Sequence, residues 1–281
     1  MHKIVVNNVF SFTTHKRGLS DVDIEDRIAI DLEKRRYALS DGVTNSVLPE
    51  VWAQLLVDEY LKINQVEDFP SVSLSTNYQV ARDLYAASLS KEKMYDLEIR
   101  EEVFEVSSAT FVGVEINEST FCCQIIGDSC LFVIPDEGDL CCISSLQPQY
   151  DDFGRVIVRF NNNPNQLYSN GMKKGEWVVK EESLKTGWIL LMSDKMSMWF
   201  INQHNIGQNP LNKLLNIKDN YQFEEFVENE YQLGKLESDD ETVVMIHLVH
   251  QNNSNASQTE DINTNNVACD TLASKNIQVD S

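Results

Sequence analysis

Histidine and glycine are scarce in this 281-residue sequence, and their scarcity argues against several common kinds of catalytic site. The five histidines are scattered, and none has the H-x-x-x-H spacing of a metal-ligand pair. A Ser-His-Asp or Cys-His catalytic apparatus therefore has no local support. The 11 glycines form no Gly-rich loop of the kind that cradles a nucleotide phosphate.

Long apolar runs are also missing. No stretch approaches the roughly 20 apolar residues that a membrane-spanning helix needs. Residues 1–6 lack the apolar segment and small-residue cleavage site of a secretory signal. Four of the six cysteines form adjacent pairs within strand-like sequence, where neighbouring side chains point to opposite faces. We therefore expect a cytoplasmic protein with reduced, mostly buried thiols, without disulfides, zinc or membrane contact.

Basic residues are outnumbered by acidic ones, 23 to 44, which gives a formal net charge of 23 − 44 = −21. Such a surface repels phosphate backbones and anionic lipids, so a nucleic-acid partner is not expected. Hydrophobic residues make up 42% of the chain, as in an ordinary globular protein. The length is sufficient for a substantial core without disulfides or structural metals.

The hydrophobic pattern changes period along the chain. Alternation predicts strands near both ends and in the middle, and helical spacing predicts helices between these strand blocks. The predicted strands are 3–13, 27–32, 36–40, 109–116, 120–126, 129–134, 141–145, 156–160, 188–192 and 242–249. The predicted helices are 46–63, 77–90, 197–203, 210–217 and 221–233, with Ser46 as a candidate N-cap of the first. Because few β-α-β alternations occur, the pattern indicates an α+β fold.

Two segments differ from this pattern. Residues 161–180 are turn-rich and irregular, which is typical of a surface loop or of a flap beside an active site. Residues 251–281 are rich in Asn, Ser, Thr and Asp and contain no aromatic residue. We expect this tail to be disordered, because it has little apolar surface to bury. Residues 1–250 then form the folded domain.

Carboxylates at predicted strand ends are the strongest chemical signal. They occur at Glu25-Asp26, Asp41-Gly42, Gly127-Asp128, Ser193-Asp194 and Asp239-Asp240. Each alone is an ordinary turn or cap residue. A sheet can bring strand ends together, however, and several ionised carboxylates in one place need a cation between them. Oxygen ligands alone select hard ions such as Mg²⁺ or Mn²⁺.

The order of these islands resembles that of the metal-dependent (PPM, type 2C) protein serine/threonine phosphatases, over nearly the whole chain apart from the tail. The matching segments are Glu25-Asp26-Arg27, Tyr37-Ala38-Leu39-Ser40-Asp41-Gly42-Val43, Ser107-Ser108-Ala109-Thr110, Ile125-Ile126-Gly127-Asp128-Ser129, Leu190-Leu191-Met192-Ser193-Asp194 and Asp239-Asp240-Glu241-Thr242-Val243. Each match is loose, but six matches in the right order carry more weight than any one. The compact, divergent form is more typical of bacterial than of eukaryotic members.

The resemblance implies a four-layer α-β-β-α sandwich, in which two antiparallel sheets are flanked by helices. It also implies two Mn²⁺ or Mg²⁺ ions. Asp41 would bridge them, the Gly42 carbonyl would bind one, and Asp194 and Asp239 would complete the ligands. Asp26, or Glu25, would act through bound water, so Asp41 and Asp26 are the expected catalytic residues. Asp128, with Asp194, matches a third, weaker metal position.

The departures from the family pattern concern the surroundings of these ligands. The nearest upstream candidates for the phosphate-binding Arg are Lys16 and Arg17, of which Arg17 is the expected phosphate ligand. Thr44-Asn45 replaces a Gly-Gly pair, and Lys195 replaces a Gly beside the expected metals.

Three functions remain open at this stage. The first is metal-dependent hydrolysis of phosphoserine and phosphothreonine on proteins, by a metal-activated water and without a covalent enzyme intermediate. This enzyme would act as a monomer on a phosphoprotein, with a cognate Ser/Thr kinase as a further candidate partner. The second is a weak or inactive module that binds a kinase or phosphoprotein, and the third is hydrolysis of small phosphate esters.

Overall fold

The computed structural model describes residues 3–44, 46–71, 73–88, 107–160, 166–169, 173–174 and 177–251. Two five-stranded antiparallel sheets form its centre. The β15 sheet has the order β1 (Ile4–Thr14), β15 (Glu241–His250), β14 (Gly187–Met192), β7 (Cys130–Pro135) and β8 (Cys141–Ile143). The β5 sheet has the order β13 (Val178–Ser183), β6 (Thr120–Ile126), β5 (Phe111–Ile116), β3 (Arg36–Ser40) and β2 (Arg27–Asp31).

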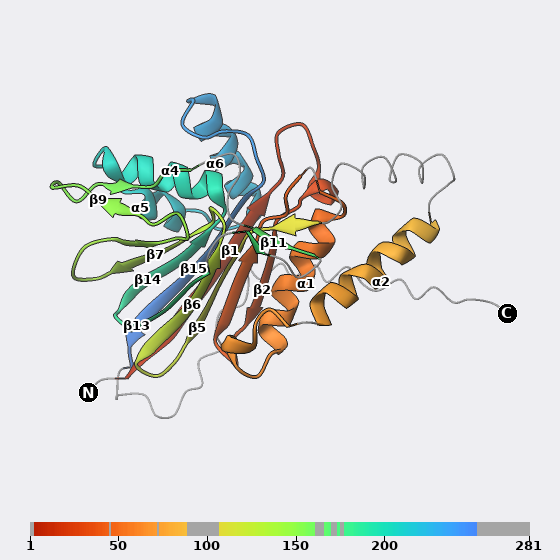
Figure 1. Ribbon diagram of the computed structural model, residues 1–281. Coiled ribbons are helices and arrows are strands. Elements are labelled where there is room, and N and C mark those ends of the chain that lie inside the picture. Colours follow the sequence, from red (N-terminus) through yellow and green to blue (C-terminus); the bar gives the residue numbers. More distant parts are fainter. Residues whose placement is uncertain are drawn as a thin grey trace.

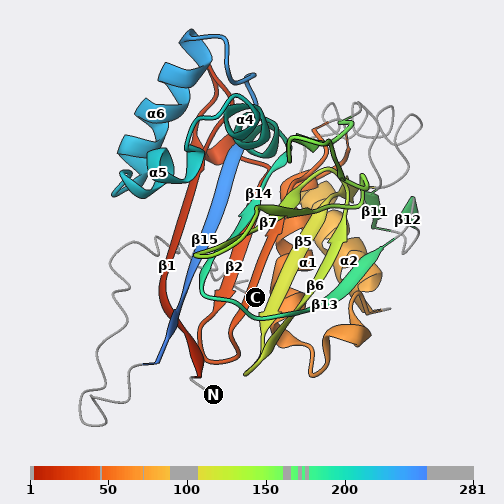
Figure 2. The same ribbon diagram turned by 90° about the vertical axis from the view of Figure 1, so that its left-hand side faces the viewer.

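Helices cover the outer face of each sheet (Figures 1 and 2). The β5 sheet carries α1 (Pro49–Lys62) and α2 (Ser73–Ser88), whereas α4 (Asp194–Asn205), α5 (Pro210–Leu215) and α6 (Asn220–Gln232) lie on the β15 sheet. Short strands β4 (Ser108–Ala109), β11 (Gln166–Tyr168) and β12 (Lys173–Lys174) form a third sheet, and β9 (Gln149–Tyr150) pairs with β10 (Val156–Ile157). Single 3₁₀ turns occur at Asp21–Asp23 and Val66–Asp68. This arrangement confirms the predicted α+β sandwich.

Three apolar clusters hold the four layers together. The central cluster lies between the sheets and includes Leu39, Val112 and Ile246. A second, with Trp199 and Phe223, joins the β15 sheet to α4 and α6. A third surrounds Tyr60 and joins the β5 sheet to α1 and α2. Since both sheets are covered on both faces, central strands such as β14 are continuously apolar rather than alternating.

The first helix begins later than its sequence pattern predicts. Its N-cap is Leu48, in a left-handed conformation with φ of 51° and no side-chain cap bond, and Pro49 opens the helix. The Ser46 hydroxyl donates instead to the Val43 carbonyl, 2.8 Å away. The N-cap prediction for Ser46 is therefore wrong. Pro49 is suited to the first helical position because it has no N–H that needs a partner.

The structure describes part of the predicted irregular segment 161–180 and, of the predicted tail, residue 251. The described parts of 161–180 contain β11, β12 and the start of β13, so this segment is more regular than predicted. Residues 161–165, 170–172 and 175–176 and the tail from 252 to 281 lie outside the described residues. Among the described helices, none has the length and apolarity that crossing a bilayer requires.

Candidate metal centre

The strand registers place the predicted acidic residues at one end of the sandwich. In the β15 sheet, Met192 pairs with both Val243 and Cys130, so the segments carrying Asp194, Asp239 and Asp128 share one end. In the β5 sheet, Arg27 pairs with Ser40, which places Asp26 and Asp41 side by side. The Gly127-Asp128 turn runs directly from β6 in one sheet to β7 in the other. The two groups of carboxylates therefore meet where the sheets are linked.

Their electrostatic interactions show that these side chains form one acidic cluster, defined as Asp26, Asp41, Asp128, Asp194 and Asp239. Burial raises the pKa of Asp41 well above its usual range, and the charges of the other four members raise it further. Burial, with Asp194 next, raises the pKa of Asp128 to about 7. Burial likewise raises the pKa of Asp194, and Asp239 adds to this shift while Lys195 opposes it. Five chain-distant segments thus place mutually repelling charges together.

Asp26 is the member of the acidic cluster whose negative charge is least compensated by neighbouring groups. Its side chain is buried, and neither carboxylate oxygen has a hydrogen-bond partner among the described residues. Burial raises its pKa well above the usual range; the side chain of Thr242, which lies nearby but outside hydrogen-bond geometry, opposes this shift, and the carboxylates of Asp240, Asp239 and Asp194 add to it. A buried carboxylate without a partner is costly unless a proton or a cation neutralises it.

Gly42 lies where the chain leaves β3 towards α1. It forms an isolated bridge with Ala109, and the Asp41 carbonyl accepts the Thr110 amide at 2.9 Å. A Cβ on Gly42 would approach the backbone carbonyl atoms of Pro49 to 2.9 Å. Glycine is therefore required here by the close approach of the α1 N-terminus, and this contact fixes the path of the Asp41-Gly42 segment.

Lys16, rather than Arg17, reaches the acidic cluster. The Lys16 Nζ lies 2.9 Å from Glu25 Oε2, 3.1 Å from Asp239 Oδ1 and 2.6 Å from the Thr44 hydroxyl. Burial acts to lower the pKa of Lys16, but the two carboxylates outweigh it and raise the pKa above its usual range. This ammonium therefore stays charged at neutral pH.

Arg17 points to α6 instead. Its Nη2 lies 3.2 Å from Glu228 Oε1, and its guanidinium lies over the Tyr231 ring at 4.6 Å from the centroid. The phosphate-binding role expected of Arg17 stays a prediction, and these contacts give it no support. The sequence did not separate these two adjacent candidates, because their directions are set by the turn that follows β1, in which the Leu19 amide donates to the Lys16 carbonyl at 3.0 Å.

Lys195 is the second cation at the cluster. Its Nζ lies 3.1 Å from Asp194 Oδ2 and 3.4 Å from Glu237 Oε2, and its amide donates to Asp194 Oδ1 at 2.6 Å. Asp194 and Asp239 thus each have an ammonium partner, in contrast to Asp26.

Two further acidic residues, Asp240 and Glu241, were not among the expected ligands. The Asp240 carboxylate accepts the backbone amides of Lys16, at 2.9 Å, and Glu25, at 2.7 Å, and so fastens the N-terminal segment to the start of β15. Glu241 is fully buried, and neither of its carboxylate oxygens has a hydrogen-bond partner among the described residues. A charged residue at the start of a mostly apolar strand was the available sequence signal.

The donor chemistry of the cluster fits a hard divalent cation. All five side chains offer carboxylate oxygens, and both oxygens of Asp26 are buried and without a partner. Within the described residues, no three Asp, Glu, His or Cys side chains are arranged closely enough to form a ready ligand set. The residues fit such an ion by donor type, and Asp26 and Asp128 are also buried, whereas their individual roles as ligands stay predictions.

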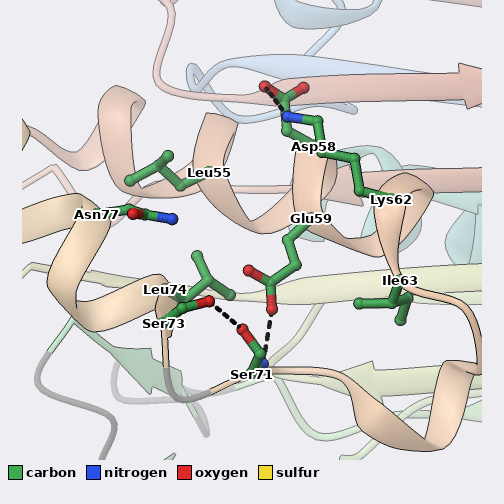
Figure 3. Close-up of a pocket in the computed structure, with 9 residues that line it drawn as sticks. All are labelled: Leu55, Asp58, Glu59, Lys62, Ile63, Ser71, Ser73, Leu74 and Asn77. Atoms are coloured by element: carbon green, nitrogen blue, oxygen red, sulfur yellow. Dashed lines mark hydrogen bonds and ion pairs between the residues drawn. The ribbon is translucent and has the colours of Figure 1, made fainter.

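A separate pocket lies between α1 and the start of α2 (Figure 3). Its lining includes Asp58, Lys62 and Asn77 but no member of the acidic cluster. Glu59 Oε1 accepts the Ser71 amide at 2.7 Å across one side, so part of its polar lining is already paired. The acidic cluster is the stronger candidate site.

Comparison with known proteins finds similarity in structure but not in sequence. No protein-family model matches the chain, and no curated protein matches its sequence. The catalytic domain of the serine/threonine protein phosphatase PstP, in complex with two manganese ions, shares 19% identity at a TM-score of 0.50, covering 89% of this chain and 100% of that chain. The serine/threonine phosphatase Stp1 from Staphylococcus aureus shares 16% identity at a TM-score of 0.52, covering 89% and 98%.

A Mycobacterium tuberculosis serine/threonine phosphatase, PstP/Ppp, matches at 18% identity and a TM-score of 0.50, with 88% of this chain and 100% of that chain covered. This chain has the PPM-type serine/threonine phosphatase fold. Coverage extends over almost the full length of these proteins, so both sheets and both helical layers belong to the shared fold. At this level of identity the PPM-type fold is established, and the chemistry has to be argued from this chain's own residues.

Proposed function

We propose that this protein hydrolyses phosphoserine and phosphothreonine on protein substrates with the help of Mn²⁺ or Mg²⁺. The observation that supports this most directly is the acidic cluster. Carboxylates from both sheets gather there, and the buried Asp26 oxygens have no hydrogen bond among the described residues. A divalent cation would neutralise this charge. The PPM-type fold adds support, and one protein with this fold, the PstP catalytic domain, is described as a complex with two manganese ions.

The proposed centre would be held by Asp41, Asp194 and Asp239, with the Gly42 carbonyl and Asp26 in supporting positions and Asp128 at a third position. Bound divalent ions lower the pKa of a coordinated water and polarise a phosphoryl group. The chain itself supplies two ammonium groups, on Lys16 and Lys195, close enough to the carboxylates to meet the oxygens of an incoming phosphate. Asp240 keeps the Lys16 segment in place through its two backbone hydrogen bonds.

A decisive experiment compares wild type with Asp41→Asn. After chelation and addition of Mn²⁺, we expect wild type to release phosphate from a phosphothreonine peptide, and Asp41→Asn to be slower by about 100-fold or more, because a lost metal ion removes several kcal/mol of transition-state stabilisation. Asp139→Asn, an exposed carboxylate outside the cluster, serves as the matched control and should keep wild-type turnover. Circular dichroism checks that both variants fold. Absence of any Mn²⁺-dependent phosphate release by wild type would overturn the proposal.

A second function is favoured by the two lysines. Ammonium groups already neutralise Asp194 and Asp239, as they would in a module that binds a phosphoprotein or its kinase without turnover. The same assay separates the two functions when peptide binding is measured in parallel by fluorescence anisotropy. Binding of the phosphopeptide without phosphate release supports the module, whereas release that depends on Mn²⁺ supports the enzyme.

A further inference from the structure

Thr110 is a buried polar residue at the point where two strands of the β5 sheet end. The next residue, Phe111, opens β5 and pairs with Ile126, the last residue of β6. On the other side, the Thr110 amide donates to the Asp41 carbonyl at 2.9 Å, just beyond the end of β3. Thr110 therefore lies between the Asp41 segment and the turn that carries Asp128.

The Thr110 side chain contacts that turn directly. Its hydroxyl lies 2.9 Å from the hydroxyl of Ser129, the residue after Asp128, and both side chains are buried. The Thr110 carbonyl also accepts the Ser40 hydroxyl at 2.7 Å. Valine has nearly the same shape as threonine and would need no partner, whereas a buried hydroxyl is costly without one. The hydroxyl pair is thus a specific contact between the β5 sheet and the turn.

The same turn is attached on its other side by Ser145, which lies just beyond β8 of the β15 sheet. The Gly127 amide donates to the Ser145 hydroxyl at 3.1 Å, and that hydroxyl donates to the Gly127 carbonyl at 2.6 Å. Ser145 thus fixes the turn to the β15 sheet, and Thr110 fixes it to the β5 sheet. The Thr110 contact is therefore the one that joins the Asp128 turn to the strand end carrying Asp41.

We propose that Thr110 is a positioning residue of the divalent-cation centre, which uses its hydroxyl to hold the Asp128 turn in place relative to Asp41. This inference rests on the proposed metal-dependent function and extends it to a residue that offers no ligand. Its physical basis is the narrow geometry that such ions accept, above all Mg²⁺, so the residues that orient the ligands affect how tightly the ion binds.

The test measures metal affinity rather than turnover, by isothermal titration of Mn²⁺ into chelated, desalted protein. Asp128→Asn identifies the binding that depends on Asp128. Thr110→Val removes the hydroxyl but keeps the backbone hydrogen bonds to Asp41 and Ser40, and it should weaken that same binding about tenfold. Thr110→Ser restores a hydroxyl and should bind Mn²⁺ nearly as tightly as wild type. Ser129→Ala should resemble Thr110→Val, and the double variant should be no weaker than either single variant.

The matched control removes a hydrogen-bonded side chain far from the acidic cluster. Asn205 ends α4, at the opposite end from Asp194. Its Nδ2 donates to the Val156 carbonyl at 2.7 Å, and its Oδ1 accepts the Val156 amide at 2.9 Å. Asn205→Leu should lower the melting temperature and leave Mn²⁺ affinity unchanged. If it weakens Mn²⁺ binding as much as Thr110→Val does, lost stability alone explains both results and the inference is overturned.

The outcomes separate this inference from the proposed function. If wild type itself binds no Mn²⁺, the metal centre is wrong and the inference falls with it. If wild type binds Mn²⁺ and Thr110→Val or Asp128→Asn binds it equally well, only the positioning role of Thr110 is overturned. Should Thr110→Val fail to fold, Ser129→Ala removes the same contact from the other side. Unchanged Mn²⁺ affinity in that variant would then count against the inference.

Discussion

At the scale of single residues, the two adjacent cations at the end of β1 have different environments. Lys16 is largely buried and contacts Glu25, Asp239 and Thr44. Arg17 is half-exposed and contacts Glu228 and Tyr231 on α6. Buried charge pairs are costly to break because the remaining carboxylates lose their partner, whereas exposed pairs contribute little.

We therefore expect Lys16→Met to lower the free energy of unfolding of the metal-free protein by about 1–3 kcal/mol. Arg17→Met should have a much smaller effect. Urea denaturation measures both. Added Mn²⁺ should recover part of the loss in Lys16→Met, because the ion replaces the ammonium beside Asp239. Equal destabilisation by the two variants would contradict this assignment. The Arg17→Met variant also tests the expected phosphate contact, since a raised KM for phosphopeptide would support it.

At the scale of elements, a buried arginine joins the β5 sheet to the end of α1. Arg36 of β3 donates through Nε to Glu115 Oε2 on β5 at 3.0 Å. Its Nη1 donates to the carbonyls of Tyr60 and Ile63, and its Nη2 donates to the Asn64 carbonyl at 3.1 Å. The last carbonyls of a helix have no partner within the helix, so one side chain satisfies several of them.

Replacing Arg36 by Met should lower the free energy of unfolding by about 3–5 kcal/mol, because it leaves Glu115 and the helix-end carbonyls without partners. Chemical denaturation of the full chain measures the change. Lys62→Met is a suitable control. Lys62 lies at the same helix end but is well exposed and pairs only with Asp58, at 3.8 Å, among the ion pairs described. Lys62→Met should change the free energy of unfolding only slightly. An equally small change in Arg36→Met would contradict the role of Arg36 as a cap of α1.

Ser193 lies at a helix boundary that the sequence placed at residue 197, whereas α4 begins at Asp194. It precedes α4 in the N-cap position, as the Ser-Asp pattern suggests, but its hydroxyl makes no cap bond to that helix. The hydroxyl instead accepts the Thr242 amide of β15. The helix thus starts three residues earlier than predicted, and the Ser193 side chain joins β14 to β15 beside the acidic cluster.

At the scale of the whole molecule, the raised carboxyl pKa values predict an unusual dependence of stability on pH. The folded-state pKa of Asp128 is about 7, above the ordinary value near 3.8, and those of Asp26 and Asp41 are raised in the same direction. Between pH 3.8 and about 7, the unfolded chain binds fewer protons than the folded protein. Stability therefore falls as the pH rises through this range. His247, whose pKa burial lowers, acts in the opposite direction.

In the presence of chelator, we expect the melting temperature to fall between pH 5 and pH 7.5, and Asp128→Asn to reduce this slope. Comparison of the two proteins in the same buffers removes the contribution of His247. With saturating Mn²⁺ the slope should flatten or reverse, because metal ions bind deprotonated carboxylates. Scanning calorimetry provides the measurement. If metal-free wild type instead becomes more stable up to pH 7.5, the carboxyl pKa values of the acidic cluster are not raised as described.

The sequence by itself determined the type and order of most elements and the acidic islands between them. Those signals are local, since hydrophobic period and turn chemistry depend on neighbours within a few residues. The tertiary structure decided which side chains meet. Lys16 and Asp240 are 224 residues apart, and Thr242 and Ser193 are 49 apart, yet each pair forms a hydrogen bond. That Lys16 rather than Arg17 contacts the acidic cluster, and that Glu241 is buried, follows from contacts between distant parts of the chain, which local sequence does not encode.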